Sequence, residues 1–119
     1  MKHVLILAIL LMAIPACVQA HATAERSEPK VGSDLTKSPA EVRIWFTEEL
    51  EPAFSKIIVF APDGKEIDKK DTHVDPKDKR VLIVSLPPNL SPGAYHVHWH
   101  VVSIDTHRTQ NEFTFNLKP

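Results

Sequence analysis

The sequence predicts an all-β domain, either a β-sandwich or a small barrel. Short apolar runs of strand length follow one another from about residue 40 onward, and clusters of Gly, Pro, Asn and Asp separate them. No convincing amphipathic helix lies between these runs. Strands at this spacing are typical of antiparallel sandwiches and barrels, so we expect one such domain.

Five segments have the length and pattern of strands. The run at 42–46 alternates aliphatic and polar residues before an aromatic end, and every second residue of 112–117 is apolar. The expected strands are Val42–Phe46, Ile57–Phe60, Val81–Val84, Ala94–Val102 and Glu112–Leu117. The charged stretch at 65–80 alternates in sign, which favours a solvated hairpin or loop.

The start of the chain has the features of a secretory signal peptide. A positively charged start, an apolar run at 4–14 and small residues at the −3 and −1 positions predict cleavage after Ala20. The chain then divides into a leader, 1–20, and a mature domain, 21–119, that begins with His21. The apolar run is shorter than the roughly 20 residues of a membrane-spanning helix, so we expect an exported, soluble protein.

Cys17 offers a competing cleavage point. The residues before it loosely resemble a lipoprotein box, although Pro15 is unusual there. Lipidation at Cys17 would leave His21 inside the chain. With cleavage after Ala20, the only cysteine leaves with the leader, and the mature domain folds without a disulfide.

Composition narrows the classes of function. The chain has 14 Lys and Arg against 15 Asp and Glu, and these charges are dispersed, so nothing indicates a nucleic-acid partner. No Ser/His/Asp or Cys/His catalytic set is apparent, so we expect no enzyme. The length suits a single core, and we expect a monomer.

The segment GAYHVHWHVVSIDTH, at 93–107, carries most of the functional information. In an extended strand, successive side chains point to opposite faces, so this segment separates into two sets. The apolar set is Tyr95, Val97, Trp99 and Val101, and the other set is His96, His98 and His100. We expect the apolar set in the core. The histidines then lie on the outer face, either without a ligand or as a weaker secondary site for Cu(II), Zn(II) or Ni(II).

A candidate metal site follows that strand. Asp105 and His107 are two residues apart, so in an extended segment their oxygen and nitrogen donors point to the same side. A free N-terminal His21 chelates through its α-amine and imidazole, whose ordinary pKa values are about 8 and about 6.5. With Glu48 as a further oxygen donor, these residues form the mixed nitrogen and oxygen set that Cu(II) prefers.

Several separated pieces of the sequence together resemble the CopC family of periplasmic copper-binding proteins. They are a mature N-terminal His, SEPKVGS at 27–33, VRIWFTEEL at 42–50, SPGAYHVHW at 91–99, SIDTH at 103–107 and FTFNL at 113–117. The resemblance implies a small Greek-key, immunoglobulin-like β-sandwich in the periplasm. It also implies one Cu(II) per chain, held by His21, Asp105 and His107, with Glu48 at the matching acidic position.

The same resemblance implies a role in copper homeostasis or resistance. The protein would sequester copper or deliver it to an inner-membrane transporter of the CopD kind. Thr106 departs from the family pattern, which often has Gly at that position. Both methionines, Met1 and Met12, lie in the leader, so the Met-rich Cu(I) site of some family members cannot form here.

Two other classes of function stay open at this point. An N-terminal His with a second His is also the copper brace of lytic polysaccharide monooxygenases, although those enzymes need an open coordination position and a broad substrate platform. An immunoglobulin-like interaction module without metal is the other alternative, because this fold hosts many functions.

Overall fold

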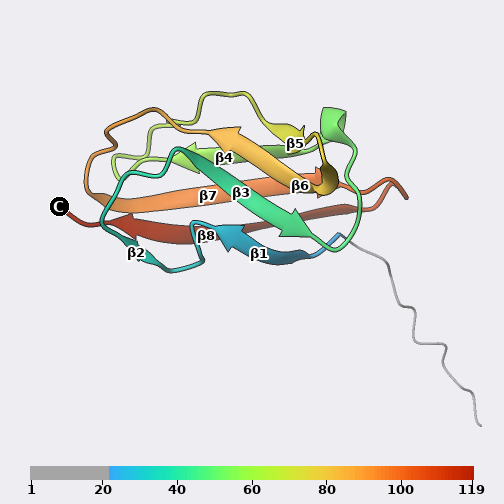
Figure 1. Cartoon of the computed structure of the whole chain (residues 1–119), viewed down its shortest axis with the longest axis horizontal. Helices are drawn as coiled ribbons and strands as arrows, with labels where there is room; N and C mark the ends of the chain where they lie inside the picture. Colours follow the sequence, from blue (N-terminus) through green and yellow to red (C-terminus); the bar gives the residue numbers. More distant parts are fainter. Residues whose placement is uncertain (1–21) are drawn as a thin grey trace, which may run out of the picture.

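The computed structural model describes residues 22–119. The expected signal peptide, its cleavage site, Cys17 and His21 lie outside the described residues. Within 22–119, the chain forms two four-stranded sheets that pack face to face (Figure 1). The all-β prediction is confirmed, and the architecture is the sandwich and not a barrel, because neither sheet closes on itself.

The first four strands alternate between the two sheets along the chain, and the last four form two hairpins, each within one sheet. One sheet has the order β1-β3-β6-β5, and the other has the order β2-β8-β7-β4. The bounds are β1 Ala24–Glu28, β2 Asp34–Leu35, β3 Glu41–Phe46, β4 Lys56–Phe60, β5 His73–Asp75, β6 Asp78–Ser85, β7 Gly93–Val102 and β8 Arg108–Leu117. A single 3-10 turn, η1 Pro52–Phe54, precedes β4 within the described region.

The five expected strands are all present, as β3, β4, β6, β7 and β8, and each is longer than its apolar run. Three further strands were not expected from the sequence. β1 has only one buried residue, Ser27, so it carries no apolar periodicity. β2 is two residues long, and β5 lies in the charged stretch, where a turn joins it to β6 as the expected hairpin.

The core fills the space between the sheets with the residues that the alternation predicted. Tyr95, Val97, Trp99 and Val101 are buried, whereas His96, His98 and His100 on the same strand are exposed. Two aromatic contacts join strands in the core, the first between the two sheets and the second between neighbouring strands of one sheet. Phe46 of β3 meets Trp99 of β7 edge to face at 5.0 Å between ring centres, and Tyr95 stacks on Phe115 of β8 at 5.2 Å.

The β7–β8 hairpin is the longest paired unit and carries the functional residues. It pairs in continuous register from Gly93 with Leu117 to Val102 with Arg108. The loop at its tip therefore projects beyond one end of the sandwich (Figure 1). This end is also where β1 begins and where the chain leaves β3.

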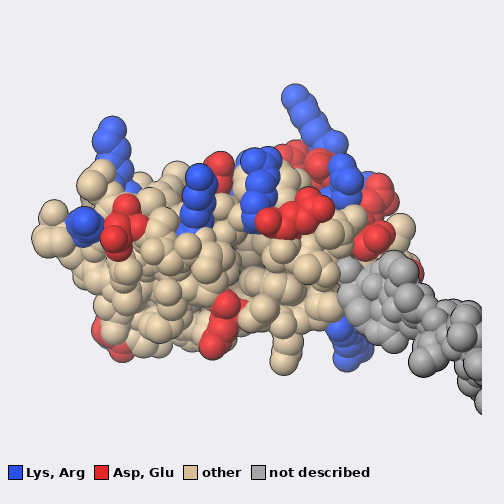
Figure 2. Space-filling model, turned by 90° about the horizontal axis from the view of Figure 1, so that it is seen from below, with Lys and Arg blue, Asp and Glu red and all other residues tan. Residues whose placement is uncertain are grey.

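Charged side chains are spread over the surface. On the face shown in Figure 2, Lys and Arg are interspersed with Asp and Glu, and no continuous patch of one sign covers it. This distribution agrees with the near-neutral net charge of −1. In the described part of the chain, no helix has the length and apolar character needed to cross a membrane.

Candidate metal centre

The loop 103–107 between β7 and β8 brings Asp105 and His107 together. Two backbone hydrogen bonds close it: the Ser103 amide donates to the His107 carbonyl at 3.0 Å, and the Thr106 amide donates to the Ser103 carbonyl at 2.8 Å. The His107 Nδ1 atom lies 3.0 Å from the Asp105 Oδ2 atom. The two side chains are 46% and 40% exposed, so the donor pair is accessible to an ion.

Ser103 orients this pair and was not identified from the sequence. Its hydroxyl is buried at the base of the loop and donates a hydrogen bond to the Asp105 Oδ1 atom. The hydrogen bond from Ser103, followed by the contact with His107, lowers the pKa of Asp105 below its ordinary value. The sequence pattern gave no signal for this role, because the contact depends on the turn at Ile104 and Asp105 and not on the extended segment that the spacing of Asp105 and His107 predicted.

Thr106, between the two candidate ligands, has a left-handed backbone with a φ of 71°. A β-branched residue rarely adopts this conformation, which is where Gly is favoured. The Thr106 hydroxyl donates a 2.6 Å hydrogen bond to the Asp105 carbonyl, which partly offsets the strain. The loop therefore places Asp105 and His107 side by side at a cost in backbone energy.

Replacing Thr106 with Gly will raise the free energy of unfolding by about 0.5–1 kcal/mol. The left-handed conformation costs an ordinary residue about 1–2 kcal/mol, and Gly does not have this cost. Gly is more flexible in the unfolded chain, however, which lowers the gain in stability by about 0.5–1 kcal/mol. Urea denaturation of the mature domain measures the change. Asn89→Gly is the control, because Asn89 has a φ of 57° and Asn tolerates this conformation. An equal gain in both variants, or a loss in Thr106→Gly, contradicts the prediction.

The first described residues are fixed beside this loop. Ala22 is fully buried, and its carbonyl accepts a 2.8 Å hydrogen bond from the Thr109 hydroxyl, two residues beyond His107. The Thr23 amide donates to the Thr47 hydroxyl at 3.0 Å, and the Thr47 amide donates to the Thr23 carbonyl at 3.0 Å. The beginning of the domain is thus attached both to β8 and to the end of β3.

The segment that contains Glu48 lies against the same loop. The Ile104 amide donates to the Glu49 carbonyl at 3.1 Å, and Leu50 forms an isolated bridge with Ser103. Within residues 22–119, however, no three His, Cys, Asp or Glu side chains are close enough to hold a metal ion. Glu48 therefore does not form a ready three-ligand set with Asp105 and His107, and a further donor is required.

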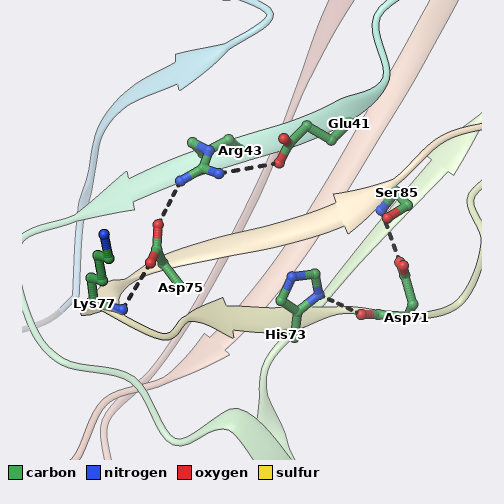
Figure 3. Close-up of polar contacts among 7 residues, drawn as sticks. All are labelled: Glu41, Arg43, Asp71, His73, Asp75, Lys77 and Ser85. Carbon is green, nitrogen blue, oxygen red and sulfur yellow. Dashed lines mark hydrogen bonds and ion pairs between the residues drawn. The ribbon is translucent and has the colours of Figure 1, made fainter.

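A second polar cluster, on the outer face of β3, β6 and β5, is internally satisfied (Figure 3). Arg43 contacts Asp75 at 2.7 Å and Glu41 at 3.5 Å. The amide of Lys77 and the guanidinium of Arg43 lower the pKa of Asp75. His73 is exposed, and its Nδ1 atom contacts the carbonyl of Asp71, two residues earlier in the chain, at 2.8 Å. These contacts hold the β5–β6 hairpin against β3 and leave no donor set for a metal.

This chain is similar over most of its length to known proteins. The family model described as "CopC domain" matches residues 24–118. Three relatives are similar over most of this chain. Protein YobA of Escherichia coli strain K12 is 35% identical, covering 85% of this chain and 82% of its own length. Copper resistance protein C of Pseudomonas syringae pv. tomato is 31% identical, covering 90% and 88%.

The third relative is much longer than this chain. Copper transport protein CutJ of Bacillus subtilis is 31% identical over 95% of this chain but only 21% of its own length. Among solved structures, the crystal structure of CopC from Methylosinus trichosporium OB3b superposes with a TM-score of 0.77 at 26% identity. It covers 83% of this chain and 95% of that one, so the same sandwich accounts for nearly all of both folds.

Proposed function

Because this chain belongs to the CopC family, we propose that it is an exported, periplasmic protein that binds one Cu(II) ion per chain and sequesters it or delivers it to a membrane copper transporter. The observation that carries the proposal is the accessible pair of Asp105 and His107, held beside the anchored start of the domain.

The ligands we propose are the α-amine and imidazole of His21, the Asp105 carboxylate and the His107 imidazole, with Glu48 as a further oxygen donor. Ala22 is hydrogen-bonded to Thr109, and His21 precedes Ala22 directly in the sequence. Because consecutive Cα atoms are about 3.8 Å apart, we expect His21 to begin close to the 103–107 loop. Cleavage after Ala20 supplies the amine. The anchoring of Ala22 and Thr23 supports this arrangement because it limits how far the new N-terminus can move from the loop.

The donor types favour the +2 state of copper. Amine, imidazole and carboxylate groups suit a tetragonal Cu(II) site, whereas Cu(I) selects thioethers and thiolates. The chain has two Met and one Cys, and all three precede residue 21. A Cu(I) site made of sulfur ligands is therefore not available in the mature domain.

Delivery to a transporter is supported by the architecture of one relative. A region similar to this chain makes up about a fifth of a longer protein that is named a copper transport protein. For a separate, monomeric chain, the same transfer needs a membrane partner, which we take to be an inner-membrane transporter of the CopD kind. The half-exposed donor pair at the tip of the β7–β8 hairpin is accessible to such a partner.

Two observations favour this proposal over the alternatives of a copper-dependent oxidative enzyme and a metal-free interaction module. Acidic ligands beside the ion neutralise its charge and occupy positions that an oxidative enzyme keeps open for its co-substrate. The family membership disfavours the module, because relatives are named for copper resistance and copper transport. Peroxide-dependent turnover of a polysaccharide by the copper-loaded protein would show that it is an oxidative enzyme and contradict the proposal.

The mature protein will bind one equivalent of Cu(II) with a tetragonal, type 2 spectrum. Mixed nitrogen and oxygen ligands give this geometry, whereas a blue-copper spectrum needs a Cys thiolate, which the mature domain lacks. Electron paramagnetic resonance of the loaded protein measures it, and nitrogen couplings are expected. Mass spectrometry of the exported protein confirms in the same sample that the chain begins at His21. A blue-copper spectrum, or no stoichiometric binding, contradicts the proposal.

A further inference from the structure

A second donor set lies on the outer face of the same hairpin. A shallow hollow on this face is lined by residues of three strands, which include His98 and His100 of β7, Gln110 and Glu112 of β8, and Ile58 of β4. The strand register brings His98 opposite Glu112 and His100 opposite Gln110. Two imidazoles and one carboxylate therefore surround the same solvent-accessible depression.

The closest pair in this hollow already has the separation of two metal ligands. The His98 Nε2 atom lies 3.2 Å from the Glu112 Oε2 atom. Two ligand atoms bound to one Zn(II) at about 2.0–2.2 Å, with angles between about 90° and 110°, lie roughly 2.8–3.6 Å apart. Phe60 packs edge-on against the His98 ring at 5.1 Å between ring centres, which restrains the ring from the other side.

We propose that this hollow is a binding site for a second divalent transition-metal ion, with His98, His100 and Glu112 as its protein ligands and water completing the coordination. Alternate side chains on a strand are about 7 Å apart at the backbone, a distance that two imidazoles close by turning toward each other. His100 must turn in this way, because no three such side chains in residues 22–119 already converge on one point.

The structure distinguishes the three histidines, which the sequence alone did not. His96 is flanked by Phe60 on β4 and Thr114 on β8, so it has no carboxylate across either strand boundary. His98 lies opposite Glu112 on β8. His100 lines the same hollow as His98, whereas His96 does not. The site is thus made by His98 and His100, and His96 lies outside it.

The neighbouring charges set the strength of binding. Lys56 of β4 pairs with His100, and its ammonium group disfavours a cation nearby. The three ligands are also exposed, with the His98 and Glu112 side chains 46% and 69% accessible. The ion will therefore bind more weakly than Cu(II) at the first centre, the one proposed for His21, Asp105 and His107. The two sites share no residue, so this inference does not depend on the proposed function.

Zn(II) alone is the probe, added to mature protein that carries His107→Gln so that the first centre is disabled. Zn(II) is diamagnetic, so nitrogen-15 spectra of the histidine rings report which imidazoles bind. We expect the ring signals of His98 and His100 to shift, and those of His96 and His73 to stay. His98→Gln, His100→Gln and Glu112→Gln will each weaken Zn(II) binding at least about tenfold, and Lys56→Gln will tighten it.

His96→Gln is the matched control, since it removes an exposed imidazole from the same row and leaves the hollow intact. It will leave the affinity for Zn(II) unchanged. All of these substitutions are on the surface, and thermal melts check that each variant stays folded. The proposal is overturned if His96→Gln weakens binding as much as His98→Gln, if Glu112→Gln has no effect, or if no ring signal shifts.

The two centres are separated by a Cu(II) titration. In protein with an intact His107, His98→Gln will keep the first equivalent of Cu(II) and lose the second. If the first equivalent is absent from all variants while Zn(II) still shifts His98 and His100, the proposed Cu(II) function fails and this site stands. If His98→Gln loses the first equivalent of Cu(II), the tight site lies on the outer face of β7 and β8. This result would overturn both the proposed Cu(II) centre and the proposal of a separate, weaker site.

Discussion

A protein that carries one extra residue ahead of His21 will bind Cu(II) at least about 100-fold more weakly than the protein cleaved after Ala20. The extension converts the α-amine of His21 into an amide and moves the new amine away from the chelate ring. An amine titrates at a pKa of about 8, so a metal ion displaces its proton readily near neutral pH, whereas an amide gives up its proton only with difficulty. A factor of 100 is about 2.7 kcal/mol of binding free energy.

Competition titration against a Cu(II) chelator measures the two affinities. The variant has a Gly before His21, and the control carries the same Gly after Pro119, at the other end of the chain. The control is expected to bind as the unextended protein does. Equal affinities in the two extended proteins would mean that the N-terminus is not a ligand.

His107→Gln will also weaken the first Cu(II) equivalent at least about 100-fold. Gln has a similar size and can accept a hydrogen bond, but it lacks the imidazole nitrogen, which is a strong donor to Cu(II). The Nδ1 atom of His107 stands 3.0 Å from the Asp105 carboxylate, so the variant removes one member of an adjacent pair. The same chelator competition measures the loss.

His73→Gln is the control for this variant. His73 is exposed on β5 in the other sheet, and its ring contacts the carbonyl of Asp71. Removing it takes away one imidazole without touching either candidate centre. If His73→Gln weakens the first equivalent as much as His107→Gln, Cu(II) binds the histidines non-specifically and the assignment of the loop is wrong.

The parts of the fold predicted well from the sequence are those in which apolar residues alternate. In β7, large apolar residues occupy every second position, so the core set and the exposed histidines could be assigned without coordinates. β1 could not be found in this way. It is held by backbone pairing with β3, and its sequence AERSE has no apolar periodicity. A strand of this kind is defined by its partner and not by its own residues.

The candidate site also has parts that the sequence predicted and parts that it did not. The spacing of Asp105 and His107 predicted that they act together, but the extended conformation expected for them is wrong, since Ile104 and Asp105 form a turn and Thr106 has a φ of 71°. This turn, and not the alternation of a strand, brings the two side chains together. The role of Thr109 and Thr47 in fixing Ala22 and Thr23 depends on contacts between strands far apart in the sequence. Likewise, the pairing of His98 with Glu112 follows from the register of β7 and β8, which the sequence pattern does not specify.

The central claim is that one Cu(II) ion binds where the start of the domain meets the 103–107 loop. The most direct test is a crystal structure of the mature, Cu(II)-loaded protein with an anomalous difference map recorded at the copper absorption edge. We predict the strongest peak within bonding distance of the His21 amine and imidazole, with His107 and Asp105 completing the site. A strongest peak on the outer face of β7 and β8, beside His98 and Glu112, would contradict the account.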